Sequence, residues 1–366
     1  MHLPGLTRLS RLGWLPLAAA LCTCGGPGDP IVLGAAGPWH LQYAMMSKRG
    51  IDLAVEEVNR GGGIGGRPLR VEFRNDSADA SHGVQIASDF VADRRVAAVL
   101  GHVNSGSMVA AARIYHGELA AVSPTAASPE LSGISPWVFR LISNDSVFGV
   151  LLARRASGLG RRAAVLYDNN SFGRGGAYAF RRNFAGRIVS ADPIWPGDLD
   201  LAPFVSYYRQ HGVDLVFVAG VTPSGRALLQ EARRQGYRGA ILGTDSWAPL
   251  AGERRDAEGV YIAMRFSVLE PRPEVAAFAR TFRARYGDQA PDGFAAFAYD
   301  ATHLLARALR EKGADRAGVR DYLAALERTG PYPGVTGPVR FTPGGDPASS
   351  RFVLLRVRGG RLTLVR

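Results

Sequence analysis

The chain has 366 residues, which is enough for two domains with separate cores, and its 46% apolar and 21% charged residues are typical of a globular protein. The formal net charge is +12, but nearly all basic residues are arginines, and they are scattered rather than clustered between aromatic residues. Because nucleic-acid-binding surfaces show such clusters, the charge does not indicate a nucleic-acid partner.

The N-terminal 24 residues are typical of an export signal. Arginines precede a short apolar run at 12–21, and small residues with two cysteines follow it. Leu21, three residues before Cys24, resembles the pattern of a bacterial lipoprotein signal with Cys24 as the lipidated residue. An ordinary signal peptide with incidental cysteines is the alternative. Both cysteines lie here, so no disulfide is expected in the folded body. No later apolar run is long enough to predict a transmembrane helix.

Beyond the signal, short apolar strands alternate with segments of helical periodicity. Strands are expected at 31–36, 69–73, 96–100, 120–122, 163–167, 188–189, 214–219, 240–243, 350–356 and 362–365. Helices are expected at 41–59, 81–93, 108–115, 147–157, 172–184, 201–211, 225–235, 274–286, 293–311 and 316–327. The alternation predicts βαβ units, and the length divides them between two α/β lobes.

Small polar turns follow five of these strands, at 104–107, 123–128, 168–172, 221–224 and 244–247. Ligands of open α/β sheets bind at the carboxyl ends of strands, so these turns predict a site between the lobes. The first turn also opens a helix, whose free N–H groups favour a small anion such as a carboxylate. The alternative is that Ser105 or Ser107 only caps that helix.

Known catalytic motifs are missing from the sequence. Gly61, Gly63 and Gly66 fit G-x-G-x-x-G, but a helix precedes them and a strand follows, the reverse of a dinucleotide-binding fingerprint. We interpret them as a tight helix-to-strand connection. There is no P-loop, H-E-x-x-H or G-x-S-x-G motif, and the seven histidines stand far apart. We therefore expect a binding protein rather than an enzyme, with no cofactor and no metal.

Several segments together resemble bacterial extracytoplasmic solute-binding proteins of the Leu/Ile/Val-binding type, which serve ABC importers. They include Gly-x-x-Leu-Ala-Val-Glu-Glu-Val-Asn at 50–59, Gly-His-x-x-Ser-Gly-Ser at 101–107 and Ser-Pro-Thr-Ala-x-Ser-Pro-Glu-Leu at 123–131, with shorter matches at 61–66, 138–140, 225–236 and 258–259. The resemblance implies two Rossmann-like, doubly wound lobes that are joined by three crossings and close on a ligand by a hinge. It places residues 30–143 and 266–335 in the first lobe, and 144–265 and 336–366 in the second.

The resemblance also implies roles for site residues. Ser105 and nearby main-chain N–H groups would hold the ligand's α-carboxylate, and Asp245 would pair with its α-ammonium. Tyr43 would cover the ligand. The alternatives are a solvated turn for Asp245 and a core position for Tyr43. The predicted ligand-binding residues are Tyr43, Asn104, Ser105, Gly106, Thr125, Ala126, Ala127, Ser128, Phe172, Val221, Thr222, Asp245 and Trp247.

The sequence departs from the family pattern at several positions, among them Pro38-Trp39-His40, where the family usually has Pro-x-Ser-Gly after the first strand. Ala127 stands where the family often has threonine, Phe172 where it commonly has an aromatic hydroxyl, and Val221-Thr222 where Gly-Tyr is common. Because a missing buried partner costs about 1–3 kcal/mol, these changes could move the preference away from simple branched-chain amino acids.

The resemblance implies a monomeric receptor in the periplasm or lipid-anchored at the outer face of the cell membrane. It would deliver an amino acid or a similar small amphoteric ligand to the membrane permease subunits of an ABC importer. The alternative is a ligand sensor of the same fold that controls a signalling partner.

Overall fold

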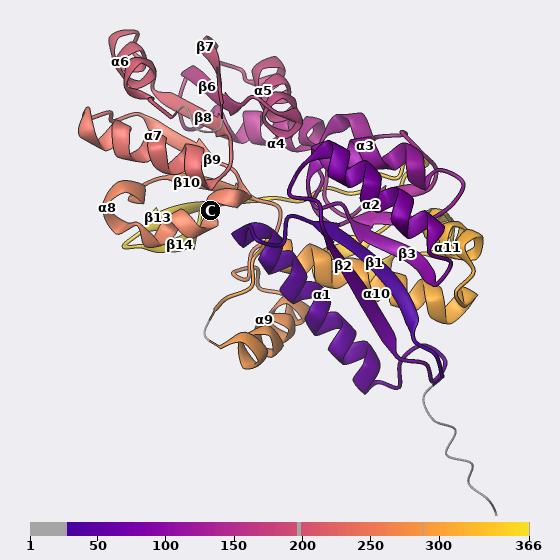
Figure 1. The fold of residues 1–366 in the computed structure, drawn as a ribbon. Helices are drawn as coiled ribbons and strands as arrows, with labels where there is room; N and C mark the ends of the chain where they lie inside the picture. Colours follow the sequence, from indigo (N-terminus) through magenta and orange to yellow (C-terminus); the bar gives the residue numbers. More distant parts are fainter. Residues whose placement is uncertain (1–27, 196–198, 288, 366) are drawn as a thin grey trace, which may run out of the picture.

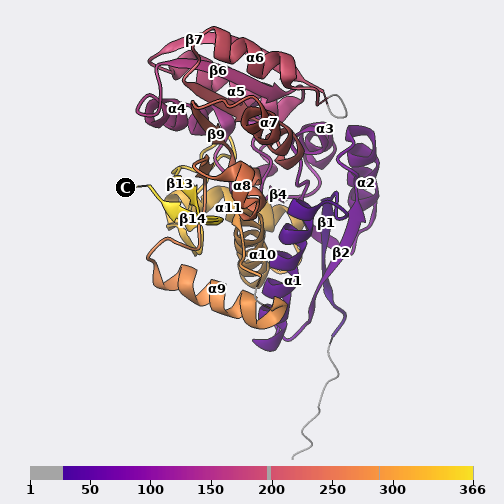
Figure 2. The ribbon, with the colours of Figure 1, turned by 90° about the vertical axis from the view of Figure 1, so that its left-hand side faces the viewer.

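The computed structural model describes residues 28–195, 199–287 and 289–365, which form two lobes (Figures 1 and 2). The predicted export signal and Cys24 lie outside the described residues. Within the described part of the chain, no helix has both the length and the apolar character needed to cross a bilayer.

The first lobe is built on a parallel five-stranded sheet in the order β2-β1-β3-β4-β5. Its strands are β1 (Ile31–Gly37), β2 (Leu69–Asn75), β3 (Val96–Gly101), β4 (Ala121–Ser123) and β5 (Val138–Arg140). Side chains of β1 alternate between two core clusters, with Leu33 in one and Val32 in the other, because neighbouring strand residues point to opposite faces. The sheet is therefore buried on both faces.

Helices cover both faces of this sheet. On the Leu33 side lie α1 (Gln42–Arg60), α9 (Pro273–Tyr286), α10 (Gly293–Lys312) and α11 (Arg316–Thr329). On the other side lie α2 (Ala80–Ala92), α3 (Ser105–Tyr115) and the short helix η1 (Pro129–Leu131). Figure 1 shows α1 and α10 side by side beneath the strands.

The second lobe has a seven-stranded sheet in the order β14-β13-β10-β9-β8-β6-β7. Its strands are β6 (Arg162–Asp168), β7 (Arg187–Ile194), β8 (Leu215–Ala219), β9 (Ala240–Gly243), β10 (Tyr261–Met264), β13 (Val353–Arg358) and β14 (Arg361–Leu364). One core cluster contains residues of α4 (Asp145–Ala156) and α5 (Ser171–Asn183). The other contains residues of α6 (Ala202–Gln210), α7 (Thr222–Arg234), η2 (Asp245–Gly252) and α8 (Arg254–Ala257).

The chain crosses between the lobes after β5, after β10 and before β13, and its C-terminal end lies in the second lobe (Figure 1). The third crossing differs from the sequence-based boundary at residue 336. There β11 (Tyr332–Gly334) pairs with β12 (Gly337–Val339), and Phe341 packs 5.0 Å from Phe139 in the core of the first lobe. The apolar residues around 339–341 thus bury themselves on the first lobe, and the chain enters the second sheet only at Val353.

The predicted alternation of strands and helices is confirmed, with four strands added. No strand is predicted from the sequence at β5, β10, β11 or β12, each of which has only three or four residues. The predicted βαβ units imply parallel strands, whereas β13 pairs antiparallel with both β10 and β14. The interpretation of residues 61–66 is confirmed, since Ile64 pairs with Arg67 in a tight turn between α1 and β2.

Candidate functional site

Ser105 joins the start of α3 to the loop at 125–128. Its Oγ accepts hydrogen bonds from the main-chain N–H groups of Ala127 and Ser128, both at 3.1 Å. It makes no cap to its own helix, so the capping alternative does not describe this residue. Within the described part of the chain its hydroxyl proton has no acceptor, and the side chain is only 7% exposed. Ser105 therefore keeps one hydrogen-bond donor for a further group.

The first turn of α3 supplies more donors beside Ser105. The first helical hydrogen bond runs from the N–H of Met108 to the carbonyl of Asn104, so the three preceding N–H groups lack helical acceptors. Gly106 is exposed, and no atom lies within 4 Å of where a Cβ would stand. This helix end thus has the free N–H groups on which the predicted anion site depends.

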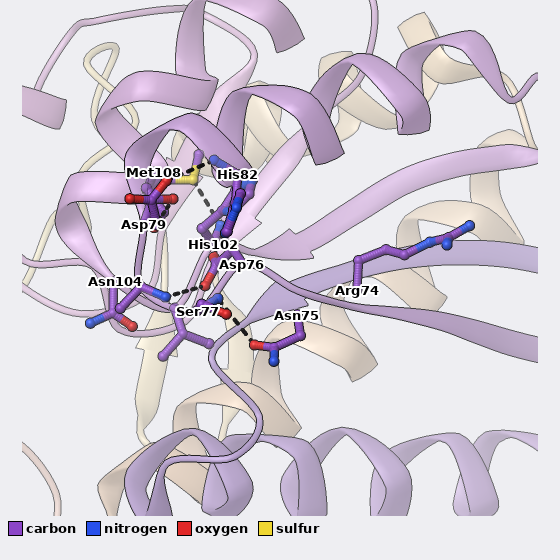
Figure 3. Close-up of polar contacts among 12 residues, drawn as sticks. Arg74, Asn75, Asp76, Ser77, Asp79, His82, His102, Asn104 and Met108 are labelled. Atoms are coloured by element: carbon purple, nitrogen blue, oxygen red, sulfur yellow. Dashed lines mark hydrogen bonds and ion pairs between the residues drawn. The ribbon is translucent and has the colours of Figure 1, made fainter.

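The turn before α3 is fixed by a cluster of buried, hydrogen-bonded polar side chains. His102 Nδ1 lies 2.8 Å from Asp76 Oδ2, and its Nε2 lies 3.0 Å from the Tyr115 hydroxyl; all three side chains are fully buried. The main-chain N–H of His102 donates to the sulfur of Met108. Figure 3 shows Asp76, His102 and Met108 together beside Asn104. Because these groups are closed to solvent, they fix the turn rather than touch a ligand.

Tyr43 lies beside the same turn. The Asn104 side-chain amide donates to the Tyr43 hydroxyl at 2.9 Å, and burial raises the pKa of Tyr43, which keeps this hydroxyl protonated. The Tyr43 ring packs 5.4 Å from Phe294, at the start of α10. Thr125, half-buried in the facing loop, donates its hydroxyl to the carbonyl of Val103 at 3.0 Å. These contacts gather the first-lobe residues of the predicted site at one edge of the sheet.

Ala126, Ala127 and Ser128 form the buried floor of this edge, each no more than 2% exposed. Ser128 accepts a hydrogen bond from the N–H of Glu130 and so begins η1. The two alanines contribute main-chain groups and no side-chain polar atom.

In the second lobe, the turn at 221–222 is fixed by hydrogen bonds to two neighbouring segments. The N–H of Val221 donates to Asp168 Oδ2 at 2.9 Å, and the Thr222 hydroxyl donates to the carbonyl of Ser246 at 2.6 Å. Both Val221 and Phe172, near the start of α5, are half-buried. They give this part of the lobe an apolar character.

Trp247, which the sequence-based prediction places among the ligand-binding residues, does not lie on the surface of the candidate site. Its side chain is fully buried in the second-lobe core, its indole N–H donates to the carbonyl of Gly220 at 2.9 Å, and its ring fills the space left by Gly225 and Gly243. Trp247 is the third residue of η2, and its ring packs inward. A ligand cannot reach it in this conformation.

Asp245 has a partner that the sequence did not reveal. Arg265, directly after β10, donates from Nη1 to Asp245 Oδ2 at 3.3 Å and from Nη2 to Asp145 Oδ1 at 2.8 Å. Its Nε donates to Ser143 Oγ at 3.3 Å, and its guanidinium lies 3.7 Å over the ring of Phe148. We call Ser143, Asp145, Asp245 and Arg265 the hinge cluster, because it spans two crossings. In it, two carboxylates share one guanidinium.

The hinge cluster is joined to the first-lobe loop. The main-chain N–H of Asp145 donates to the carbonyl of Ala127 at 2.8 Å. A continuous chain of hydrogen bonds therefore runs from Ser105 through Ala127, Asp145 and Arg265 to Asp245. Ser105 and Asp245, which are predicted to hold the ligand's carboxylate and ammonium groups, therefore belong to one hydrogen-bond network.

The sequence matches the profile described as periplasmic binding protein over residues 32–361. The chain belongs to the periplasmic binding protein family. This confirms the family resemblance and the two-lobed fold class, and it makes the chain a binding protein rather than an enzyme.

Individual relatives cover almost the whole of this periplasmic binding protein. The leucine-, isoleucine-, valine-, threonine-, and alanine-binding protein of Pseudomonas aeruginosa is 29% identical over 359 residues, which span 93% of this chain and 94% of the relative. An ABC transporter substrate-binding protein from Desulfitobacterium hafniense, solved in complex with Leu, is 30% identical over 92% of this chain and 100% of that chain, with a TM-score of 0.80.

A third relative bears on the fold alone, because it is only 24% identical. It is the branched-chain amino acid transporter substrate-binding protein of Streptococcus pneumoniae, solved in complex with isoleucine. It has a TM-score of 0.83 and covers 92% of this chain and 99% of that chain.

Sequence reasoning missed three residues of this site. Phe294 packs on Tyr43, and Asp145 and Arg265 form the buried core of the hinge cluster. Arg265 had a visible signal, since it is a lone charged residue in the apolar segment 260–268. The other two had none, because Phe294 and Asp145 sit at helix starts where such residues are common.

Burial of Asp145 predicts a pH dependence of stability. Burial raises its pKa to about 7 despite the opposing effect of Arg265. An unfolded aspartate titrates near 4, so between about pH 4 and 7 the folded state holds a proton that the unfolded state has lost. This contribution to stability is therefore lost as the pH rises through that window.

We expect the free energy of unfolding to fall by about 2 kcal/mol more between pH 5 and pH 8 in the wild type than in Asp145→Asn. Urea unfolding at the two pH values measures this difference. Equal pH dependence in both proteins would show that Asp145 titrates normally.

Proposed function

We propose that this protein is the extracytoplasmic receptor of an ABC importer and that it binds an amino acid between its two lobes. The carboxylate of the ligand is held by the Ser105 hydroxyl and the free N–H groups at the start of α3. Its ammonium group pairs with Asp245. An aliphatic side chain fits beside the apolar Phe172 and Val221.

The observation that carries this proposal is the geometry of Ser105. Its oxygen is already held by two main-chain N–H groups, so its proton is free for a further acceptor next to an open helix N-terminus. A carboxylate is the small anion that matches this set of neutral donors. The Pseudomonas and Desulfitobacterium relatives, whose names or complexes include leucine, support an amino acid as the ligand.

The remaining parts of the proposal follow the family. Export and a lipid anchor at Cys24 would hold the receptor at the outer face of the membrane, where it meets the permease as a monomer. A sensor with the same fold would bind the same ligand but would act on a signalling partner, so co-purification with permease subunits distinguishes the two.

Isothermal titration calorimetry of protein that has been unfolded and refolded to remove carried ligand tests the proposal. The panel contains the twenty amino acids and L-leucinamide. We expect binding of at least one aliphatic amino acid and weaker binding of the amide, which lacks the carboxylate. A folded protein that binds no amino acid would overturn the proposal.

A further inference from the structure

The hinge cluster contains more negative than positive charge. Asp145 and Asp245 face the single guanidinium of Arg265, and the side chains of Asp145 and Arg265 are each 2% exposed. Within the described part of the chain, Asp145 Oδ2 has no hydrogen-bond partner. Buried carboxylates are stable when they are paired, and this cluster has one guanidinium for two carboxyl groups.

The two carboxylates do not share Arg265 equally. The contact to Asp145 is 2.8 Å, whereas the contact to Asp245 is 3.3 Å. Charge-assisted hydrogen bonds are normally 2.7–2.9 Å long, so only the bond to Asp145 is a strong one. The Asp245 side chain is also the more exposed of the two, at 15%.

Asp145 lies outside the predicted ligand contacts. It opens α4, and its side chain points to Arg265. A pocket next to the cluster is lined by residues of all three crossings, among them Ser143, Arg265 and Ser350. The cluster therefore sits at the connections between the two lobes, behind the place proposed for the ligand's ammonium group.

We propose that Asp145 is a specificity-determining residue: by drawing Arg265 to itself, it keeps the Asp245 carboxylate available for a cationic group of the ligand. This inference rests on the proposed function. It names the ligand class as compounds that carry a positive charge at the Asp245 end. Without Asp145, Arg265 would neutralise Asp245, and the site would no longer distinguish an amino acid from the same acid without its amino group.

The experiment compares L-leucine with 4-methylpentanoate, its analogue without the amino group, by calorimetry at pH 8. In Asp145→Asn we expect the preference for L-leucine over 4-methylpentanoate to fall roughly tenfold, because a neutral amide holds the guanidinium less strongly than a carboxylate does. In the double variant with Asp145→Asn and Arg265→Gln, the competing guanidinium is gone and the preference should return to within about threefold of the wild type. A residue that only supports the fold would not be rescued by removing its partner.

Asp346→Asn is the matched control. Asp346 also lies at a crossing and pairs with an arginine, Arg140, but it does not contact Arg265. Its variant should keep the wild-type preference. The single variant Arg265→Gln, which should keep or increase the preference, provides a second test if the double variant does not fold.

An unchanged preference in Asp145→Asn, or no recovery in the double variant, would overturn this inference alone. If the wild type binds another aliphatic amino acid of the panel instead of L-leucine, that amino acid and its analogue without the amino group replace the pair. A wild-type protein that binds no amino acid of the panel would overturn the proposed function and this inference together.

Discussion

Replacing Ser105 with alanine is expected to lower the affinity for L-leucine about 5- to 150-fold, the effect of a charged group losing a hydrogen bond of about 1–3 kcal/mol. The variant removes a hydroxyl donor that has no acceptor within the described part of the chain. It also leaves the N–H groups of Ala127 and Ser128 without the oxygen that holds them, so the 125–128 loop loses its tie to α3. Calorimetry with L-leucine measures the loss. L-leucinamide should lose less, because it lacks the carboxylate.

Ser107→Ala is the control for this variant. Ser107 lies two residues further along α3, is fully buried, and donates its hydroxyl to the carbonyl of Asp79 at 3.2 Å. It faces α2, so its removal is expected to lower stability by about 1 kcal/mol and to leave the affinity unchanged. If the two variants weaken binding equally, Ser105 is not the carboxylate anchor.

The part of the fold that the sequence predicts best is the alternation of buried strands and amphipathic helices. Strands such as β3 and β8 are short, continuous apolar runs between turn residues, and this pattern is typical of strands that are buried on both faces. The pattern does not predict where the chain crosses between the lobes for the third time. Val339 and Phe341 are apolar residues in a turn-rich segment, and only three-dimensional packing decides which lobe buries them.

The candidate site also has one part that the sequence predicts and one part that it does not. The anion-binding start of α3 is predictable because its parts, a strand end, a small polar turn and a helix start, are contiguous in sequence. The hinge cluster is not, because Asp145, Asp245 and Arg265 come from three distant segments. Trp247 shows the opposite error: it shares a turn with Asp245, but the geometry of η2 sends its ring into the core.

Replacing Gly50 with alanine is expected to lower the free energy of unfolding by about 2–3 kcal/mol. Gly50 lies in the interior of α1, where alanine would normally stabilise a helix by about 1 kcal/mol, so the sign of the effect is diagnostic. Here α1 packs against α10, and a Cβ on Gly50 would stand 2.1 Å from the carbonyl oxygen of Ala295. A main-chain atom in a helix cannot move aside, so the two helices must separate. Chemical denaturation measures the loss.

Gly50→Ala also tests whether the packing of α1 against α10 affects ligand binding. Tyr43 is carried by α1 and Phe294 by α10, so a wider spacing of the helices would pull apart the two rings beside the α3 turn. We therefore expect Gly50→Ala to weaken ligand binding as well as stability. Gly61→Ala, at the C-cap of the same helix, is the control, because a Cβ there would meet only ordinary contacts at 3.4 Å or more. The stability of this variant should change by less than about 0.5 kcal/mol. If Gly50→Ala proves as stable as the wild type, the close approach of α1 and α10 does not set the position of Tyr43.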